Sequence, residues 1–247
     1  MLRGDADLAV HSAKDLPAET PAGLVLAAVP ERGDPRDALV GSRLVDLPTG
    51  GHVGTGSVRR RAQLAGLRPD LTFGELRGNI PTRLERAGEF DAVVVAAAAL
   101  DRLGVADRIT ERLEPSTLLP QVGQGALAVE CRADDTETIA ALAAIDDLEA
   151  HAEIRAERAF LARLGGGCNL PCGALARRNK EGSGDGSIVL DALLASLDGR
   201  IVLRVRGAGS DPEVLGADVA RRLLDDEGAS ILLDALGVDL APAASDR

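Results

Sequence analysis

The sequence predicts a globular α/β protein, and three of its features lead to that prediction. Segments typical of strands and of helices alternate through the first two-thirds of its 247 residues. Hydrophobic residues make up 45% of the chain and charged residues 27%, a balance typical of folded rather than disordered proteins. Aromatic residues make up only 1%, so Leu, Val and Ala must fill the core.

The first part of the chain is expected to form a parallel sheet with helices on both sides. Ser57 is predicted to cap a helix over Val58–Leu67, and Asn79 to cap a helix over 80–86. The strand over Asp91–Ala96 is apolar throughout, which is typical of a parallel strand covered on both faces. The other expected strands are Asp7–Ser12, Leu24–Val29, His52–Thr55, Leu71–Leu76 and Ala126–Cys131.

A small α+β unit is predicted from about residue 147 onward. Amphipathic helices are expected over 136–144 and 148–164, and a closing helical stretch over 212–236. Strands over 188–195 and 200–206 flank Asp198-Gly199, a dipeptide typical of hairpins. The segment Lys180–Gly186 is expected to be a flexible surface loop.

Charge and cysteine content narrow the function classes. The net charge of −11 argues against a general nucleic-acid or membrane-surface binder. No apolar run of about 18 residues is present, and the first ten residues do not resemble a secretory signal. Three cysteines are too few for a disulfide framework and suit a reducing cytoplasm.

Arginines concentrate in one segment of this acidic chain. Residues 57–86 hold seven Arg against three acidic residues. Arg59 and Arg60 follow a strand-to-helix turn, and Arg77 lies at the next such turn, where anions bind in α/β sheets. A solvated helix face is the simpler explanation of any single Arg, but this placement favours a carboxylate or phosphate ligand, which matches the guanidinium groups.

Two further clusters are candidates for chemistry. In His11–Pro17, Asp15 is either a catalytic carboxylate with Lys14 anchoring an anion, or the acidic cap of a short helix, and His11 is expected to be structural. Cys168 lies in a Gly-rich segment and could be a thiolate nucleophile or an attachment site. Cys172 gives a Cys-x3-Cys spacing, but no second ligand pair exists, so no metal site is expected, and Cys131 is expected to be a buried hydrophobe.

Five motifs in this order resemble the porphobilinogen deaminase (hydroxymethylbilane synthase) family over nearly the whole chain. They are His11–Pro17, Gly54–Arg60, Arg77–Asn79 with Arg83, Leu119–Ala126, and Gly166–Cys168 with Pro171 and Gly173. The resemblance implies two domains like periplasmic binding proteins, with parallel or mixed sheets, and a small α+β domain. The boundaries expected from it are 1–29 with 121–146, then 30–120, then 147–247.

The resemblance also implies an activity. Such a transferase joins four porphobilinogen molecules into hydroxymethylbilane, releases ammonia at each step, and serves tetrapyrrole (haem) biosynthesis in the cytoplasm as a monomer. It primes the chain on a covalent dipyrromethane, which the motif places on Cys168. A non-catalytic module that binds a polycarboxylate is the alternative, against which the presence of Asp15 and Cys168 argues.

Residue roles follow motif by motif from the same resemblance. Asp15 matches the catalytic aspartate, which would stabilise the cationic pyrrole left by ammonia loss and shuttle protons. The residues that match binders of the acetate and propionate groups are Lys14, Ser57, Arg59, Arg60, Arg77 and Arg83. Further cleft contacts are expected from Thr55, Arg102 and Gln124.

The sequence departs from the family pattern at three places. Gly56 stands where Ser is usual, and Cys172 where an aliphatic residue is usual. Family members carry a β-α-β unit before the strand over Asp7–Ser12, so the first domain is expected to be incomplete, through a late start or a fragment. That strand would then expose an apolar edge.

Overall fold

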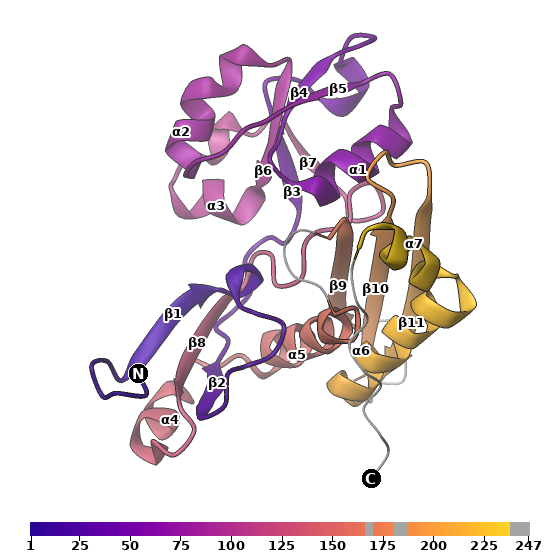
Figure 1. Cartoon of the computed structure of the whole chain (residues 1–247). Coiled ribbons are helices and arrows are strands. Elements are labelled where there is room, and N and C mark those ends of the chain that lie inside the picture. Colours follow the sequence, from indigo (N-terminus) through magenta and orange to yellow (C-terminus); the bar gives the residue numbers. More distant parts are fainter. Residues whose placement is uncertain (166–169, 180–186, 238–247) are drawn as a thin grey trace.

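The computed structural model describes residues 1–165, 170–179 and 187–237, and Figure 1 shows their arrangement. Three β-sheets form the frame, and helices pack on each of them. The chain is therefore an α/β protein, as the sequence predicts, with one mixed and two antiparallel sheets. The surface loop expected over 180–186 lies outside the described residues. None of the helices in the described ranges is long and apolar enough to cross a membrane.

The first sheet has the order β1-β8-β2 and is antiparallel throughout. Its strands are β1 (Leu8–Ser12), β2 (Leu24–Ala28) and β8 (Leu127–Arg132). Successive side chains of β8 point to opposite faces of this sheet, so a separate hydrophobic core forms on each face. Helix α5 (Leu148–Arg163) contributes to one of these cores and helix α4 (Thr136–Leu142) to the other. Strand β1 lies at the sheet edge, and its Val10 is 59% exposed, in agreement with the expected apolar edge.

The second sheet has five strands in the order β5-β4-β6-β3-β7. Parallel pairing joins only β5 (Thr72–Gly74), β4 (His52–Gly54) and β6 (Ala92–Ala96). Strand β3 (Asp37–Val40) runs antiparallel to both β6 and β7 (Glu111–Leu113), and the sequence reading missed both β3 and β7. The second sheet is therefore mixed, as the resemblance implies, and its parallel pairing is limited to β5, β4 and β6.

Three helices accompany the second sheet. Helix α1 (Val58–Leu67) begins as predicted, with the Ser57 Oγ accepting the amide of Arg60 at 3.4 Å. Asn79 caps α2 (Ile80–Glu85) through the amide of Thr82 at 3.0 Å, and α3 (Ala97–Arg102) follows β6 directly. Single 3-10 turns connect elements at Ala13–Asp15, Leu44–Asp46, Arg86–Glu89 and Ala106–Arg108.

The third sheet is an antiparallel meander of β9 (Cys172–Arg178), β10 (Ile188–Ala195) and β11 (Val202–Gly209). One face packs against α5 and α6 (Pro212–Arg221), as Figure 1 shows. Phe160 of α5 is fully buried in this core. The hairpin predicted at Asp198-Gly199 is confirmed, with Gly199 at φ 71°. The closing helical stretch continues as a π-helical turn (Arg222–Asp226) and breaks at Gly228 before α7 (Ala229–Ala235), and the sequence reading missed β9.

Candidate active site

The loop 119–126 touches all three sheets and brings the predicted motifs together. Leu119 exchanges hydrogen bonds with the Gln63 side chain on α1, at 3.0 and 2.8 Å. The carbonyl of Pro120 accepts the amide of Ala174 in β9 at 3.1 Å, and the carbonyl of Ala126 accepts the amide of Ala13 at 3.0 Å. The motif Leu119–Ala126 is therefore a junction that fixes the distance between the other motifs.

Gly123 allows this junction to approach the turn that holds Lys14 and Asp15. Its φ is +74°, and a Cβ at this position would lie 2.8 Å from the Ala13 carbonyl carbon and the Lys14 nitrogen. The Gln121 side chain donates to the Lys14 carbonyl at 3.2 Å. Only glycine tolerates this combination of positive φ and close backbone contact.

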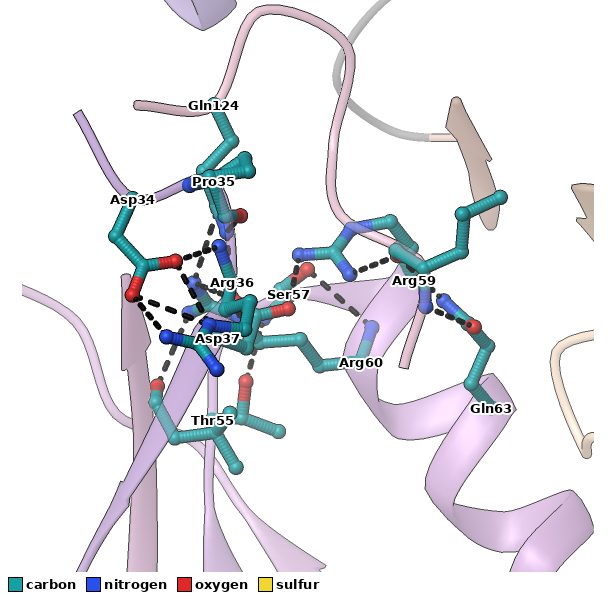
Figure 2. A network of polar contacts seen from close by, with 12 residues as sticks. Asp34, Pro35, Arg36, Asp37, Thr55, Ser57, Arg59, Arg60, Gln63 and Gln124 are labelled. Carbon is teal, nitrogen blue, oxygen red and sulfur yellow. Dashed lines mark hydrogen bonds and ion pairs between the residues drawn. The ribbon is translucent and has the colours of Figure 1, made fainter. Parts of the chain in front are cut away.

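A buried carboxylate, Asp37 on β3, pairs with the first two arginines of the arginine-rich segment (Figure 2). Its Oδ1 accepts Arg60 Nε at 2.9 Å and Arg60 Nη2 at 2.7 Å. Its Oδ2 lies 2.9 Å from Arg59 Nη2. Asp37 is fully buried, while Arg59 and Arg60 are 2% and 5% exposed, so solvated helix faces do not describe these two arginines.

The charges in this cluster shift one another's ionisation. Burial disfavours the charged form of Asp37, but Arg59 and Arg60 outweigh burial and hold the pKa of its carboxyl below the ordinary value. Burial lowers the pKa of Arg59, Asp37 opposes that effect, and Arg60 adds to it. One carboxylate thus faces two guanidinium groups, and the cluster keeps an excess positive charge.

Arg60 is held by protein groups on all of its side-chain nitrogens. Beside Asp37, its Nη1 donates to the Val94 carbonyl at 3.0 Å and its Nη2 lies 3.4 Å from Gln124 Oε1. Gln124 is fully buried and donates to the Pro35 carbonyl at 2.7 Å and to Asp37 at 2.9 Å. Arg60 and Gln124 therefore use their hydrogen-bonding groups to hold Asp37 and the neighbouring backbone in place.

Arg59 is less completely satisfied. Its Nη1 donates to the Leu119 carbonyl at 2.6 Å, but within the described residues its Nε has no hydrogen-bond partner. Arg59 lines a small cavity together with Ser57, Gln121, Val122, Leu161, Leu170 and Cys172. A buried guanidinium with an unused donor at a cavity is suited to a carboxylate ligand.

Lys14 and Asp15 stand on the single 3-10 turn that follows β1. Lys14 is half-buried, and burial lowers its pKa, the positive charge of Arg60 lowers it further, and Asp15 partly opposes both. Lys14 therefore lies within electrostatic reach of the arginine cluster. Asp15 is exposed to solvent at the same turn.

The remaining predicted cations occupy different surroundings. Arg83 is half-buried, donates to the Gly78 carbonyl at 2.8 Å, and has a pKa lowered by burial and then by Arg60. Arg102 donates to the Gly125 carbonyl at 2.7 Å.

The Arg77 side chain is 84% exposed and pairs with Glu75 at 3.0 Å, so the structure does not bring it into the cluster. Thr55 is buried and its Oγ1 accepts the amide of Ser57 at 3.2 Å.

Two buried acids at the site were missed by sequence reasoning. Asp37 could have been suspected as the counter-ion of an arginine-rich segment. Glu157 on α5 is fully buried and accepts from Arg32 at 2.6 and 3.2 Å, from the Gly123 amide at 2.7 Å and from the Ala176 amide at 2.9 Å. No local pattern marks Glu157, because its partners lie far away in the sequence.

The cysteines have distinct positions. Cys168 lies outside the described residues. Cys172 is 6% exposed at the start of β9, and Cys131 is fully buried, with burial raising the pKa of its thiol, as expected of a small core residue. In the described part of the chain no group of three or more His, Cys, Asp or Glu side chains could hold a metal ion.

Comparison with known proteins gives two family matches. Residues 1–140 match the family described as "Porphobilinogen deaminase, dipyromethane cofactor binding domain". Residues 151–225 match "Porphobilinogen deaminase, C-terminal domain". The two matches include the 3-10 turn with Asp15, the arginine cluster and strand β9.

Curated relatives give the same result. The porphobilinogen deaminase of Roseiflexus castenholzii is 53% identical over 238 residues, which cover 94% of this chain and 77% of that protein. The porphobilinogen deaminase of Thermus thermophilus is 47% identical over 239 residues, with 94% and 78% covered. A solved structure, the VFT2 domain of Bordetella pertussis BvgS, is 23% identical over 57% of this chain and 61% of that chain, at a TM-score of 0.31, too low to support an inference.

Proposed function

The chain belongs to the porphobilinogen deaminase family, and on that premise we propose how its residues divide the work of the reaction. It is a transferase of tetrapyrrole biosynthesis that polymerises porphobilinogen into hydroxymethylbilane, with release of ammonia, on a dipyrromethane cofactor. The observation that supports the division of work is the difference in hydrogen bonding between Arg59 and Arg60.

The donors of the site fit a cofactor with several carboxylates. Arg59 and Arg83 retain positive charge that the described acidic side chains do not fully compensate, Lys14 lies within electrostatic reach of this cluster, and the fork of a guanidinium matches a carboxylate. These three side chains, with Ser57, would hold the acetate and propionate groups of dipyrromethane, and Cys168 would be its attachment point. When bound, the cofactor supplies the pyrrole carbon onto which the first substrate is joined.

We assign the frame and the outer contacts to other residues. Arg60, Gln124, Thr55 and Arg102 bond mainly to protein groups and would hold the backbone against which the ligand lies. Arg77 is exposed and would meet only a carboxylate of the growing chain that extends beyond the cluster. Its pairing with Glu75 is weak enough in solvent to be exchanged for a ligand.

Asp15 would act on the reacting pyrrole. As ammonia leaves porphobilinogen, positive charge develops on the pyrrole ring, and an exposed carboxylate on the same turn as Lys14 can stabilise that charge. The same carboxylate can take up the proton that the pyrrole carbon loses when the new bond forms. Lys14, its neighbour, would orient a substrate carboxylate so that the ring faces Asp15.

The organisation that we propose has three domains, 1–29 with 121–146, 30–120, and 147–247. Each would contain one of the three sheets, with the junction loop between them. We also propose a cytoplasmic monomer without a nucleic-acid partner, in line with the net charge of −11.

The assignment of Asp15 is tested by Asp15→Asn, with Glu19→Gln as the control for an exposed acid on the same segment. We expect Asp15→Asn to lower turnover of porphobilinogen about 100-fold or more, the scale of a lost general acid-base group, while keeping the covalent cofactor. Near-normal turnover by Asp15→Asn would remove Asp15 from the mechanism. Binding of porphobilinogen by the unaltered chain without any release of ammonia would favour a polycarboxylate-binding module.

A further inference from the structure

A second group of arginines lies on the third sheet, on the face that α5 and α6 leave uncovered. Leu175 and Leu193 on this face pack against Leu119, and this apolar contact joins the sheet to the junction loop. The rest of the face carries Arg177 on β9, Asp191 on β10, and Arg204 and Arg206 on β11.

These side chains line a cavity of about 470 Å³. The opposite wall is formed by residues 114–119, so the cavity lies between the segment after β7 and the third sheet. Its volume is within the range of about 300–1,000 Å³ typical of small-molecule sites. Apart from Leu119, its lining residues differ from those of the candidate active site.

The cavity holds more positive than negative charge. Asp191 bonds to Arg177 and lies 3.9 Å from Arg206 Nε. The Arg204 guanidinium makes no hydrogen bond or ion pair with any described residue, and Asp191 is the one charge that acts on it noticeably. Glu114, on the opposite wall, is already paired with Arg36 at 2.6 Å. Three guanidinium groups therefore share one carboxylate.

The three guanidinium groups are open to solvent and to a ligand: Arg204 is exposed, and the side chains of Arg177 and Arg206 are 47% and 62% exposed. Burial of part of the Arg204 side chain lowers its pKa, and Asp191 only partly opposes that effect. A ligand with oxyanions can accept hydrogen bonds from several of these guanidinium groups at once. The register of the sheet places the arginines close enough to bind one ligand together. Arg206 lies directly opposite Asp191, and Arg204 is two residues away on the same strand.

We propose that this cavity binds a small dianion, a phosphate ester or a dicarboxylate, held by Arg177, Arg204 and Arg206. The excess charge of the three arginines over Asp191 matches two negative charges. The planar guanidinium fork suits both phosphate and carboxylate groups. The site is independent of the cofactor and substrate contacts proposed above.

Isothermal titration of the full chain at low ionic strength tests the proposal, with glycerol 3-phosphate and succinate as probes in separate arms. We expect saturable binding of one equivalent of at least one probe, and the tighter arm identifies the chemistry. Arg204→Ala should weaken this binding at least tenfold. Asp191→Asn should strengthen it several-fold, because it removes the competing carboxylate.

Two matched controls separate this cavity from other anion sites. Arg200→Ala removes an arginine from the same β10–β11 hairpin that is 87% exposed and outside the cavity, and it should leave the affinity unchanged. Arg83→Ala alters the candidate active site and should also leave it unchanged. Equal affinity in Arg204→Ala and the unaltered chain, loss of binding in Arg83→Ala, or no saturable binding of either probe would overturn the proposal.

Discussion

Replacing Asp37 by Asn should destabilise the protein far more than removing a solvent-exposed acidic side chain. The substitution keeps the shape of the side chain but removes the negative charge that faces Arg59 and Arg60. Both guanidinium groups are almost fully buried, so water cannot replace the lost carboxylate. Arg60 also loses a strong acceptor for its Nε and Nη2.

The expected loss follows from what buried ion pairs cost when one partner is removed. Breaking such a pair costs about 3–5 kcal/mol, against a typical net stability of about 5–15 kcal/mol. For a chain of this size each kcal/mol shifts the melting temperature by about 2–4 °C, so we expect a decrease of roughly 6–20 °C.

Thermal unfolding followed by circular dichroism measures this change, and Asp70→Asn is the matched control. Asp70 binds Arg68 through two hydrogen bonds of 2.8 and 2.7 Å, but both side chains are solvated, so its loss should change the melting temperature much less. The reasoning is refuted if Asp37→Asn melts within about 2 °C of the unaltered protein or no lower than Asp70→Asn.

Three further predictions concern the same framework. Glu157→Gln should cost about 3–5 kcal/mol in chemical denaturation, because it leaves the buried Arg32 without its carboxylate; a loss below about 1 kcal/mol would contradict this. Gly123→Ala should cost about 1–3 kcal/mol and lower turnover, because the new Cβ displaces the turn that carries Lys14; unchanged stability and kinetics would contradict the close contact. The difference in stability between the unaltered protein and Asp37→Asn should persist down to about pH 4 and decrease at lower pH, because a lowered carboxyl pKa gives stability that is lost only as pH falls below the ordinary value of 3.8. A difference that vanishes already between about pH 7 and 5 would contradict that sign.

The elements with strong local signals could be predicted from the sequence. Helix α1 was predicted with both of its ends, because a capping Ser57 and an uninterrupted helical pattern are local features. Strand β3 was missed because it has four residues, and its partners β6 and β7 are distant in the sequence. Strand β9 was missed because its Gly and Ala residues have low strand propensity, and burial against α5 compensates for that.

The site shows the same division between local and long-range information. Residue types and motif order identified Arg59, Arg60 and Lys14, which the structure brings together. The burial and ion pairing of Arg60 could not be predicted, because the carboxylate that binds it, Asp37, lies 23 residues away on strand β3, which was not predicted. Likewise, Arg77 follows a strand-to-helix turn as predicted, but its side chain points to solvent and pairs with Glu75.

The mass of the intact purified protein tests the central claim most directly, followed by peptide mapping of the same sample. If the chain is a working member of its family, the mass exceeds that of the polypeptide by one dipyrromethane, and mapping places the added group on Cys168. Cys168→Ser should then lack it and Cys172→Ser should retain it. An unmodified mass in folded protein that has been supplied with porphobilinogen, or a modification on Cys172, would contradict the account.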